Sequence, residues 1–144
     1  MSDADHIRIA VAAARASRWI GASAALVVAS LLLNAFTGRP LPNPALLMLC
    51  LAILSGAAAI YLMVRIELDR SIFEGATGAA DVNAYFASFD RSRLELGVGA
   101  APREARPVGE RVRGLLRLVR ALAFFFIAEL LLALASLWIA RWFF

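Results

Sequence analysis

Glu129 is the residue whose type and position most directly suggest chemistry. It lies near the middle of an apolar run from Phe124 to Leu132 and carries the only charge in that run. A charged carboxylate inside hydrocarbon costs several kcal/mol, so the group must be protonated, paired or turned toward a polar cavity. We expect a structural hydrogen bond or a contact with a partner's membrane helix. A proton or substrate pathway is the alternative.

Two further polar residues could act with Glu129. Ser136 follows it by seven residues, which places both on one helix face, two turns apart. Asn34 lies near the end of the first apolar run, where it could hydrogen-bond a neighbouring helix. The sequence does not place Asn34 at the depth of Glu129. These three residues are the candidate polar contacts among the apolar runs.

The residue types that enzymes commonly use are scarce. His6 is the only histidine, and Cys50 is the only cysteine and lies in an apolar run. The chain has no glycine-rich phosphate loop, no cysteine pair and no histidine pair with metal-ligand spacing. The sequence therefore predicts a protein that is not an enzyme and that uses no metal or cofactor.

The overall composition explains why so little of the chain is available for chemistry. Hydrophobic residues make up 62% of the 144 residues, and the mean hydropathy is +0.75. A soluble chain of this length would have too little interior to bury so much apolar surface. The length allows one domain, residues 1–144, and the composition favours lipid as its solvent.

Three apolar runs have the length of membrane spans, at about residues 19–37, 44–64 and 121–140. Each has about 20 residues, which an α-helix needs to cross the hydrocarbon core. The first run is long for a signal peptide and no Ala-x-Ala cleavage site follows it, so we expect an uncleaved anchor. The proline-rich linker 38–44 predicts a tight turn between the first two spans.

The arginines predict the orientation. The chain has fifteen basic residues, all arginine, and thirteen lie before the first span or between the second and third. Only Arg39 and Arg141 lie on the other side. Loops rich in arginine stay in the cytoplasm. We therefore expect a bacterial inner-membrane protein with a cytoplasmic N-terminus and a periplasmic C-terminus.

The expected cytoplasmic segment, residues 65–120, contains one short amphipathic helix. Asp81 suits its N-cap. One apolar face is formed by residues spaced three and four apart, namely Val82, Tyr85, Phe86 and Phe89. This face could pack on the other helices, lie on the membrane surface, or dock a partner protein. We favour the first two of these interpretations.

The third long helix is expected to start near Val108 with a basic, amphipathic segment. Its arginines are Arg111, Arg113, Arg117 and Arg120. Each could attract anionic lipid headgroups with about 1 kcal/mol near the surface. The clustering of basic charge around the apolar runs is typical of topology signals, so we expect no nucleic-acid partner.

Small residues indicate where helices could approach each other closely. Gly21, Ala25 and Ala29 are spaced by four in the first span, and Ala52, Gly56 and Ala59 share one side of the second. The sequence as a whole predicts an all-α integral membrane protein with three transmembrane helices and the short cytoplasmic helix. We expect a non-enzymatic subunit or accessory factor of a membrane assembly. Its partner would be another membrane protein or a second copy. The alternative is a homo-oligomeric transporter or channel with Glu129 in the pathway.

Overall fold

The structure is a computed structural model, and it describes residues 2–37, 41–96 and 107–142, without the side chains of residues 34, 36, 37 and 93. This part of the chain forms four α-helices and no strand. The helices are α1 (Asp3–Thr37), α2 (Asn43–Thr77), α3 (Val82–Glu95) and α4 (Val108–Trp142). The all-helical fold expected from the sequence is therefore confirmed.

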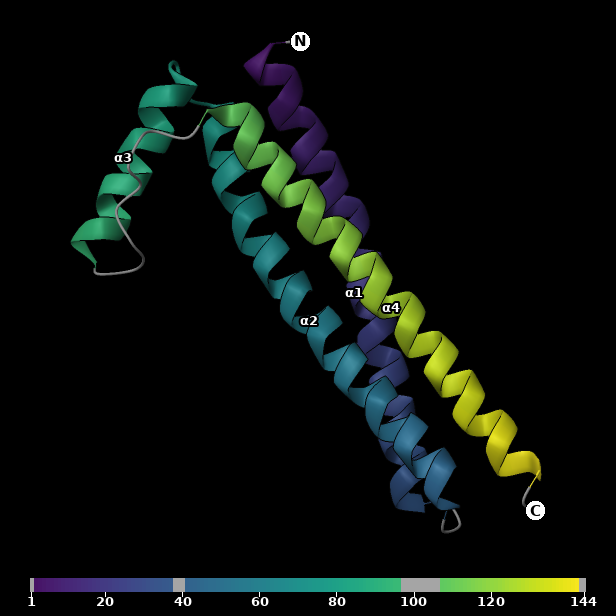
Figure 1. Ribbon diagram of the computed structural model, residues 1–144. Helices are drawn as coiled ribbons and strands as arrows, with labels where there is room; N and C mark the ends of the chain where they lie inside the picture. The colour runs from purple at the N-terminus through teal and green to yellow at the C-terminus, as the bar shows by residue number, and fades with distance from the viewer. Residues whose placement is uncertain (1, 38–40, 97–106, 143–144) are drawn as a thin grey trace.

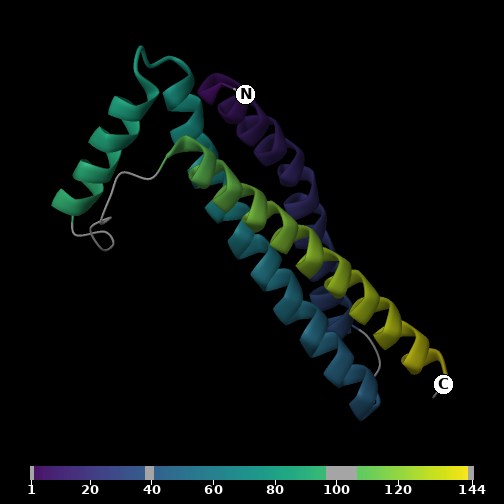
Figure 2. The same ribbon diagram turned by 45° about the horizontal axis from the view of Figure 1, so that its top comes forward.

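The three long helices lie side by side in an elongated bundle, and α3 projects from one end of it (Figures 1 and 2). The N-terminus lies at the same end as α3, and the C-terminus lies at the opposite end. We call these the α3 end and the far end. Each long helix has 35 residues, or about 52 Å at 1.5 Å per residue. All three are long and apolar enough to cross a membrane.

Local sequence signals mark some of the helix ends. The second helix begins at Asn43 with Pro44 in its first turn, where the missing N–H of proline costs no hydrogen bond. It ends at Thr77, followed by Gly78, whereas Gly75 remains inside the helix. Asp81 caps α3, because its side chain accepts hydrogen bonds from the backbone N–H groups of Asn83 and Ala84.

Buried positions recur at alternating steps of three and four residues along each long helix. This spacing averages 3.5 residues, the period with which helices pack side by side in left-handed bundles. On α4 five buried residues are spaced seven positions apart, namely Val108, Leu115, Leu122, Glu129 and Ser136. A matching series is buried on α2, consisting of Ala45, Ala52, Ala59, Ile66 and Phe73. The buried positions thus form a seam along the bundle axis. Within it the hydrophobic residues gather in two clusters, a larger one toward the α3 end and a smaller one of Leu31, Leu49, Ala52 and Ala133.

The predicted rows of small residues are half correct. Ala52, Gly56 and Ala59 are all buried, but Ala25 is only half-buried and Ala29 is exposed. The α1 seam instead continues from Gly21 to Ala24. A strict spacing of four drifts by about 40° per step around a helix with 3.6 residues per turn, so it leaves the interface within two steps.

Large apolar side chains cover the outside of the bundle. Leu26 is 70% exposed, Leu54 is 66% exposed and Leu131 is 63% exposed, and each lies in the middle of its helix. Of the 23 buried positions that the structure describes on the three long helices, 13 are alanine, glycine or serine, and the others are larger residues such as Ile66, Leu115 and Leu122. Small interior residues allow close helix approach, and the large apolar groups are left to face the surroundings.

Candidate functional site

Glu129 lies inside the bundle, where all three long helices meet. Its side chain is completely buried, with no exposed surface. It occupies space that Gly56 on α2 leaves open. A Cβ atom placed at Gly56 would lie 2.7 Å from Glu129 Oε1 and would also overlap Val28 Cγ2 of α1. The absence of a side chain at Gly56 is therefore what allows the carboxyl group to fit between α1 and α2.

Neither carboxyl oxygen of Glu129 has a hydrogen-bond partner within the described part of the chain. An ionised carboxylate buried without a partner carries a large desolvation cost, whereas the neutral acid costs much less. The enclosure therefore favours a neutral Glu129. Because helices of the same chain cover the side chain, it is not on the surface that a partner helix would contact.

Two serines connect the long helices near Glu129. Ser136 Oγ donates a hydrogen bond to the backbone oxygen of Ala45, at 3.0 Å. Ser55 Oγ donates to the backbone oxygen of Phe125, at 2.8 Å. Ser136 therefore shares the seam with Glu129 but binds α2. Ser55 was not singled out from the sequence, and only its position next to Gly56 could have indicated it. The side chain of Asn34 lies outside the described residues.

The apolar face of α3 packs on α2. Phe86 is only 3% exposed and meets Phe73 edge to face, with 5.6 Å between ring centroids. Val82 and Tyr85 are half-buried against the same cluster. Gly75 allows this approach, because a Cβ there would overlap Tyr85 Oη. The residues of the predicted face, apart from Phe89, are thus occupied by contacts within the chain.

Arg111 joins α4 to α3. Its guanidinium group forms a two-pronged ion pair with Asp90, through Nη2 and Oδ2 and, at 3.4 Å, through Nη1 and Oδ1. The same group lies over the Phe86 ring, 4.7 Å from its centroid. Such a cation–π contact contributes about 0.5–2 kcal/mol. Arg111 therefore holds α3 to α4, while Phe73 holds it to α2.

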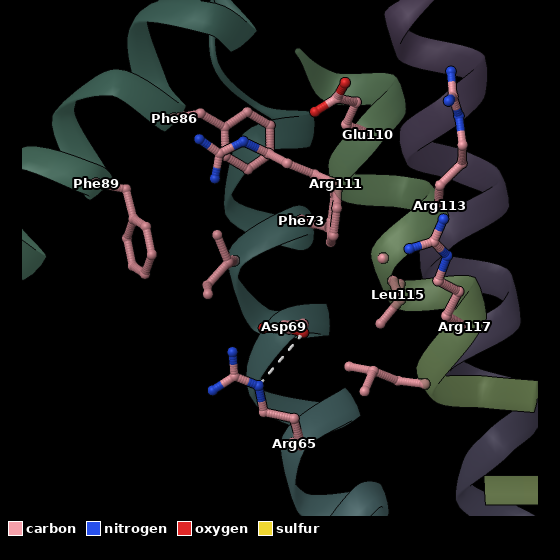
Figure 3. A pocket seen from close by; sticks show the side chains of 13 residues that line it. Arg65, Asp69, Phe73, Phe86, Phe89, Glu110, Arg111, Arg113, Leu115 and Arg117 are labelled. Atoms are coloured by element: carbon pink, nitrogen blue, oxygen red, sulfur yellow. Dashed lines mark ion pairs between the residues drawn. The ribbon is translucent and has the colours of Figure 1, made fainter. Parts of the chain in front are cut away.

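A groove of about 700 Å³ opens between α2, α3 and α4 at the α3 end (Figure 3). Four arginines line it, three from α4 and one from α2, together with two acidic residues and several apolar side chains. The arginines are Arg65, Arg111, Arg113 and Arg117. Phe89, the remaining residue of the predicted apolar face of α3, forms part of the wall of this groove.

A second basic cluster lies between α1 and α2 at the same end. Glu74 Oε1 accepts hydrogen bonds from Arg70 Nη2 at 2.9 Å and from Arg15 Nη2 at 3.2 Å. These two arginines lower the pKa of the Glu74 carboxyl. A cavity of about 410 Å³ beside them is lined by Arg15, Arg18, Trp19, Ala22 and Arg70. The α3 end therefore carries two basic hollows.

The chain matches no protein-family model, no curated protein and no solved structure. Within residues 2–37, 41–96 and 107–142, no group of three histidine, cysteine, aspartate or glutamate side chains is placed to hold a metal ion.

Proposed function

We propose that the chain is a non-enzymatic membrane protein that acts as a subunit or accessory factor of a larger membrane assembly. The observation that carries this proposal is the distribution of side chains in the bundle, with small residues inside and large apolar residues such as Leu26, Leu54 and Leu131 outside. Water would penalise that outer surface, whereas lipid or another membrane helix would cover it at no cost.

The proposed location is the bacterial inner membrane, with the α3 end in the cytoplasm. Nine arginines on α1, α2 and α4 lie toward the α3 end, at positions 8, 15, 18, 65, 70, 111, 113, 117 and 120, whereas Arg141 lies at the far end. Positive charge next to membrane spans favours the cytoplasmic side. In this orientation the N-terminus and α3 are cytoplasmic and the C-terminus is periplasmic.

The enclosure of Glu129 supports an accessory role over transport. A transported ion or proton needs a path of polar groups or water, and the carboxyl group is instead enclosed by Gly56, Val28 and the rest of the seam. One observation favours the alternative of a homo-oligomeric transporter or channel. Neither Glu129 oxygen has a hydrogen-bond partner within the described residues, so no neighbouring group holds the proton of the neutral acid in place.

Affinity purification of the full chain in mild detergent separates these two functions. An unrelated protein with three spans, carrying the same tag, serves as the control for non-specific capture. We expect a membrane protein that co-purifies with the chain in fixed stoichiometry and is absent from the control. A chain that purifies only with further copies of itself would favour the transporter, and a monomer without a partner would contradict both functions.

A further inference from the structure

We infer that the groove between α2, α3 and α4 binds the phosphate group of an anionic phospholipid. The inference rests on the proposed membrane location and adds a specific lipid site to it. Arg113 and Arg117 of α4 provide the main contacts, and Arg65 of α2 provides a third from the other side of the groove. Phosphate suits guanidinium groups, because the planar fork of donors matches two phosphate oxygens.

The charges of the groove leave the guanidinium groups of Arg113 and Arg117 available. Arg111 is committed to Asp90 and to the Phe86 ring. Arg65 lies 3.9 Å from Asp69, at the limit of an ion pair, and its side chain is half exposed. Arg113 and Arg117 have no acidic side chain within ion-pair distance among the described residues. They are four residues apart and therefore lie on the same face of α4, as Figure 3 shows.

The apolar lining of the groove favours a lipid over a soluble phosphate. Ile72, Phe89 and Leu118, all half-buried, line it together with the arginines. A free phosphate ion gains nothing from such groups, whereas the glycerol and the upper acyl chains of a phospholipid do. The volume of about 700 Å³ is also far more than one phosphate ion occupies, and it falls in the range of sites for larger ligands.

The position of the groove along the bundle also suits a lipid headgroup. Arg65 directly follows the second apolar run, and Arg117 lies four residues before the third begins at Ala121. The groove therefore lies where the apolar part of the bundle meets its charged part. Phospholipid phosphates lie at this level of a membrane, next to the hydrocarbon core.

Arg120 distinguishes a defined site from general attraction between basic residues and an anionic membrane. It is exposed and lies on α4, even closer to the apolar run than Arg117, but it does not line the groove. General attraction would make Arg120 as important as its neighbours. A site in the groove makes Arg113 and Arg117 important and leaves Arg120 without effect.

The test is lipid binding by the full chain, purified in detergent and measured by native mass spectrometry with phosphatidylglycerol and phosphatidylcholine as probes. We expect preferential retention of phosphatidylglycerol. The double variant Arg113→Gln with Arg117→Gln should weaken it by about 10-fold or more, and Arg120→Gln should leave it unchanged. Thermal unfolding of each variant in the same detergent checks that the bundle remains folded.

Several outcomes would overturn the lipid site. Equal loss in the double variant and in Arg120→Gln would indicate general surface attraction. Displacement of the lipid by millimolar inorganic phosphate would indicate a soluble phosphate ligand. Equal retention of both lipids would remove the anion preference. Fractionation of cells tests the membrane location separately. If the chain is in the membrane but the double variant binds lipid normally, only the lipid site in the groove is contradicted. If the chain is soluble, the proposed function is contradicted.

Discussion

The bundle surrounds Glu129 with atoms that match its shape and offers its oxygens no hydrogen bond within the described residues. We therefore expect Glu129→Gln, which has nearly the same shape and no charge, to fold and assemble normally. Glu129→Leu should cost less than about 1.5 kcal/mol, because it conserves most of the volume. Yield and thermal unfolding in detergent measure both effects.

The Gln variant also tests the transporter, because glutamine cannot release a proton. If the Glu129→Gln protein folds and assembles normally but loses a flux or growth phenotype, a purely structural role of Glu129 is contradicted. A proton pathway through Glu129 is then favoured. Strong unfolding of Glu129→Leu would instead show that a hydrogen bond from the carboxyl group is needed.

Gly56 should tolerate a side chain poorly, because α1 and α4 both approach it closely. A methyl group there would overlap Val28 and press on the Glu129 carboxyl group. Gly56→Ala should therefore destabilise the bundle by about 1–3 kcal/mol, the usual cost of overfilling a packed core. Gly114→Ala is the matched control, since a Cβ at Gly114 has no neighbour within 4 Å. Equal unfolding temperatures for the two variants would contradict the packing at Gly56.

The importance of Glu129 could be predicted from the sequence, but its surroundings could not. A single carboxylate in a run of apolar residues is visible without a structure, because its cost in lipid does not depend on its neighbours. The contacts with Gly56 and Val28 depend on how far each helix is displaced along its axis relative to the others. That register is set by packing along the whole seam, and no local pattern specifies it.

The ion pairs of Glu74 connect α1 and α2 at the α3 end and make this contact pH-dependent. Because Arg70 and Arg15 lower the pKa of Glu74, the ionised carboxylate stabilises the folded state at neutral pH. That contribution begins to fall below the ordinary pKa of 4.5 and is lost as the pH drops through the lowered value. Protection of residues 3–18 against hydrogen exchange, taken relative to an unfolded peptide at the same pH, should therefore fall in acid.

Two substitutions identify Glu74 as the source of this change. In Glu74→Gln, this protection of residues 3–18 should already be lower at neutral pH and should change less on acidification. Glu67→Gln removes the other carboxylate that Arg70 contacts and should retain the acid response. An unchanged acid response in Glu74→Gln would show that another group controls the α1–α2 contact.

The docking of α3 should depend on Phe86 more than on Phe89. Phe86 is 3% exposed and contacts both Phe73 and Arg111, whereas Phe89 is only half-buried at the groove. A charge at Phe86 would be buried without a partner. We expect Phe86→Asp to release α3, and Phe86→Asp with Phe89→Asp to add little. Protease protection of residues 82–95 measures the release.

Exposed Ser88 on the outer side of α3 provides the control, since Ser88→Ala should leave protease protection unchanged. If the double variant of Phe86 and Phe89 keeps wild-type protection and co-purification, the apolar face neither packs on the bundle nor docks a partner.

Among the helices, the ends were more predictable than the contacts. Pro44 and Asp81 act on the backbone at the start of their own helices, so their effects can be expected from local sequence. The spacing of Val82, Tyr85 and Phe86 indicated one apolar face, but periodicity alone does not name the surface that covers it. That surface contains Phe73 of α2, which only the tertiary structure brings close.

At the scale of the whole molecule, the distribution of arginines along the bundle favours one orientation in a membrane. The three long helices have equal length, yet their basic residues gather at the α3 end. The groove and the Glu74 cluster lie at this end as well. If this end were exported, many charged groups would have to cross the membrane, which the positive-inside bias opposes.

Topology reporters test this orientation directly. An enzyme that is active only after export should be active when fused after Phe144 and inactive when fused after Ala100. A second reporter that is active only in the cytoplasm should give the reciprocal pattern, which controls for differences in expression between the two fusions. The physical reason is that thirteen arginines lie before the first apolar run or between the second and third, against two elsewhere in the sequence, since arginine next to a span resists transfer across the membrane. The reversed pattern would show that the orientation is wrong and would place α3 and the arginine-lined groove outside the cell. Activity of both reporters at both positions would mean that the chain inserts in two orientations, and a single cytoplasmic face for the lipid site would then be lost.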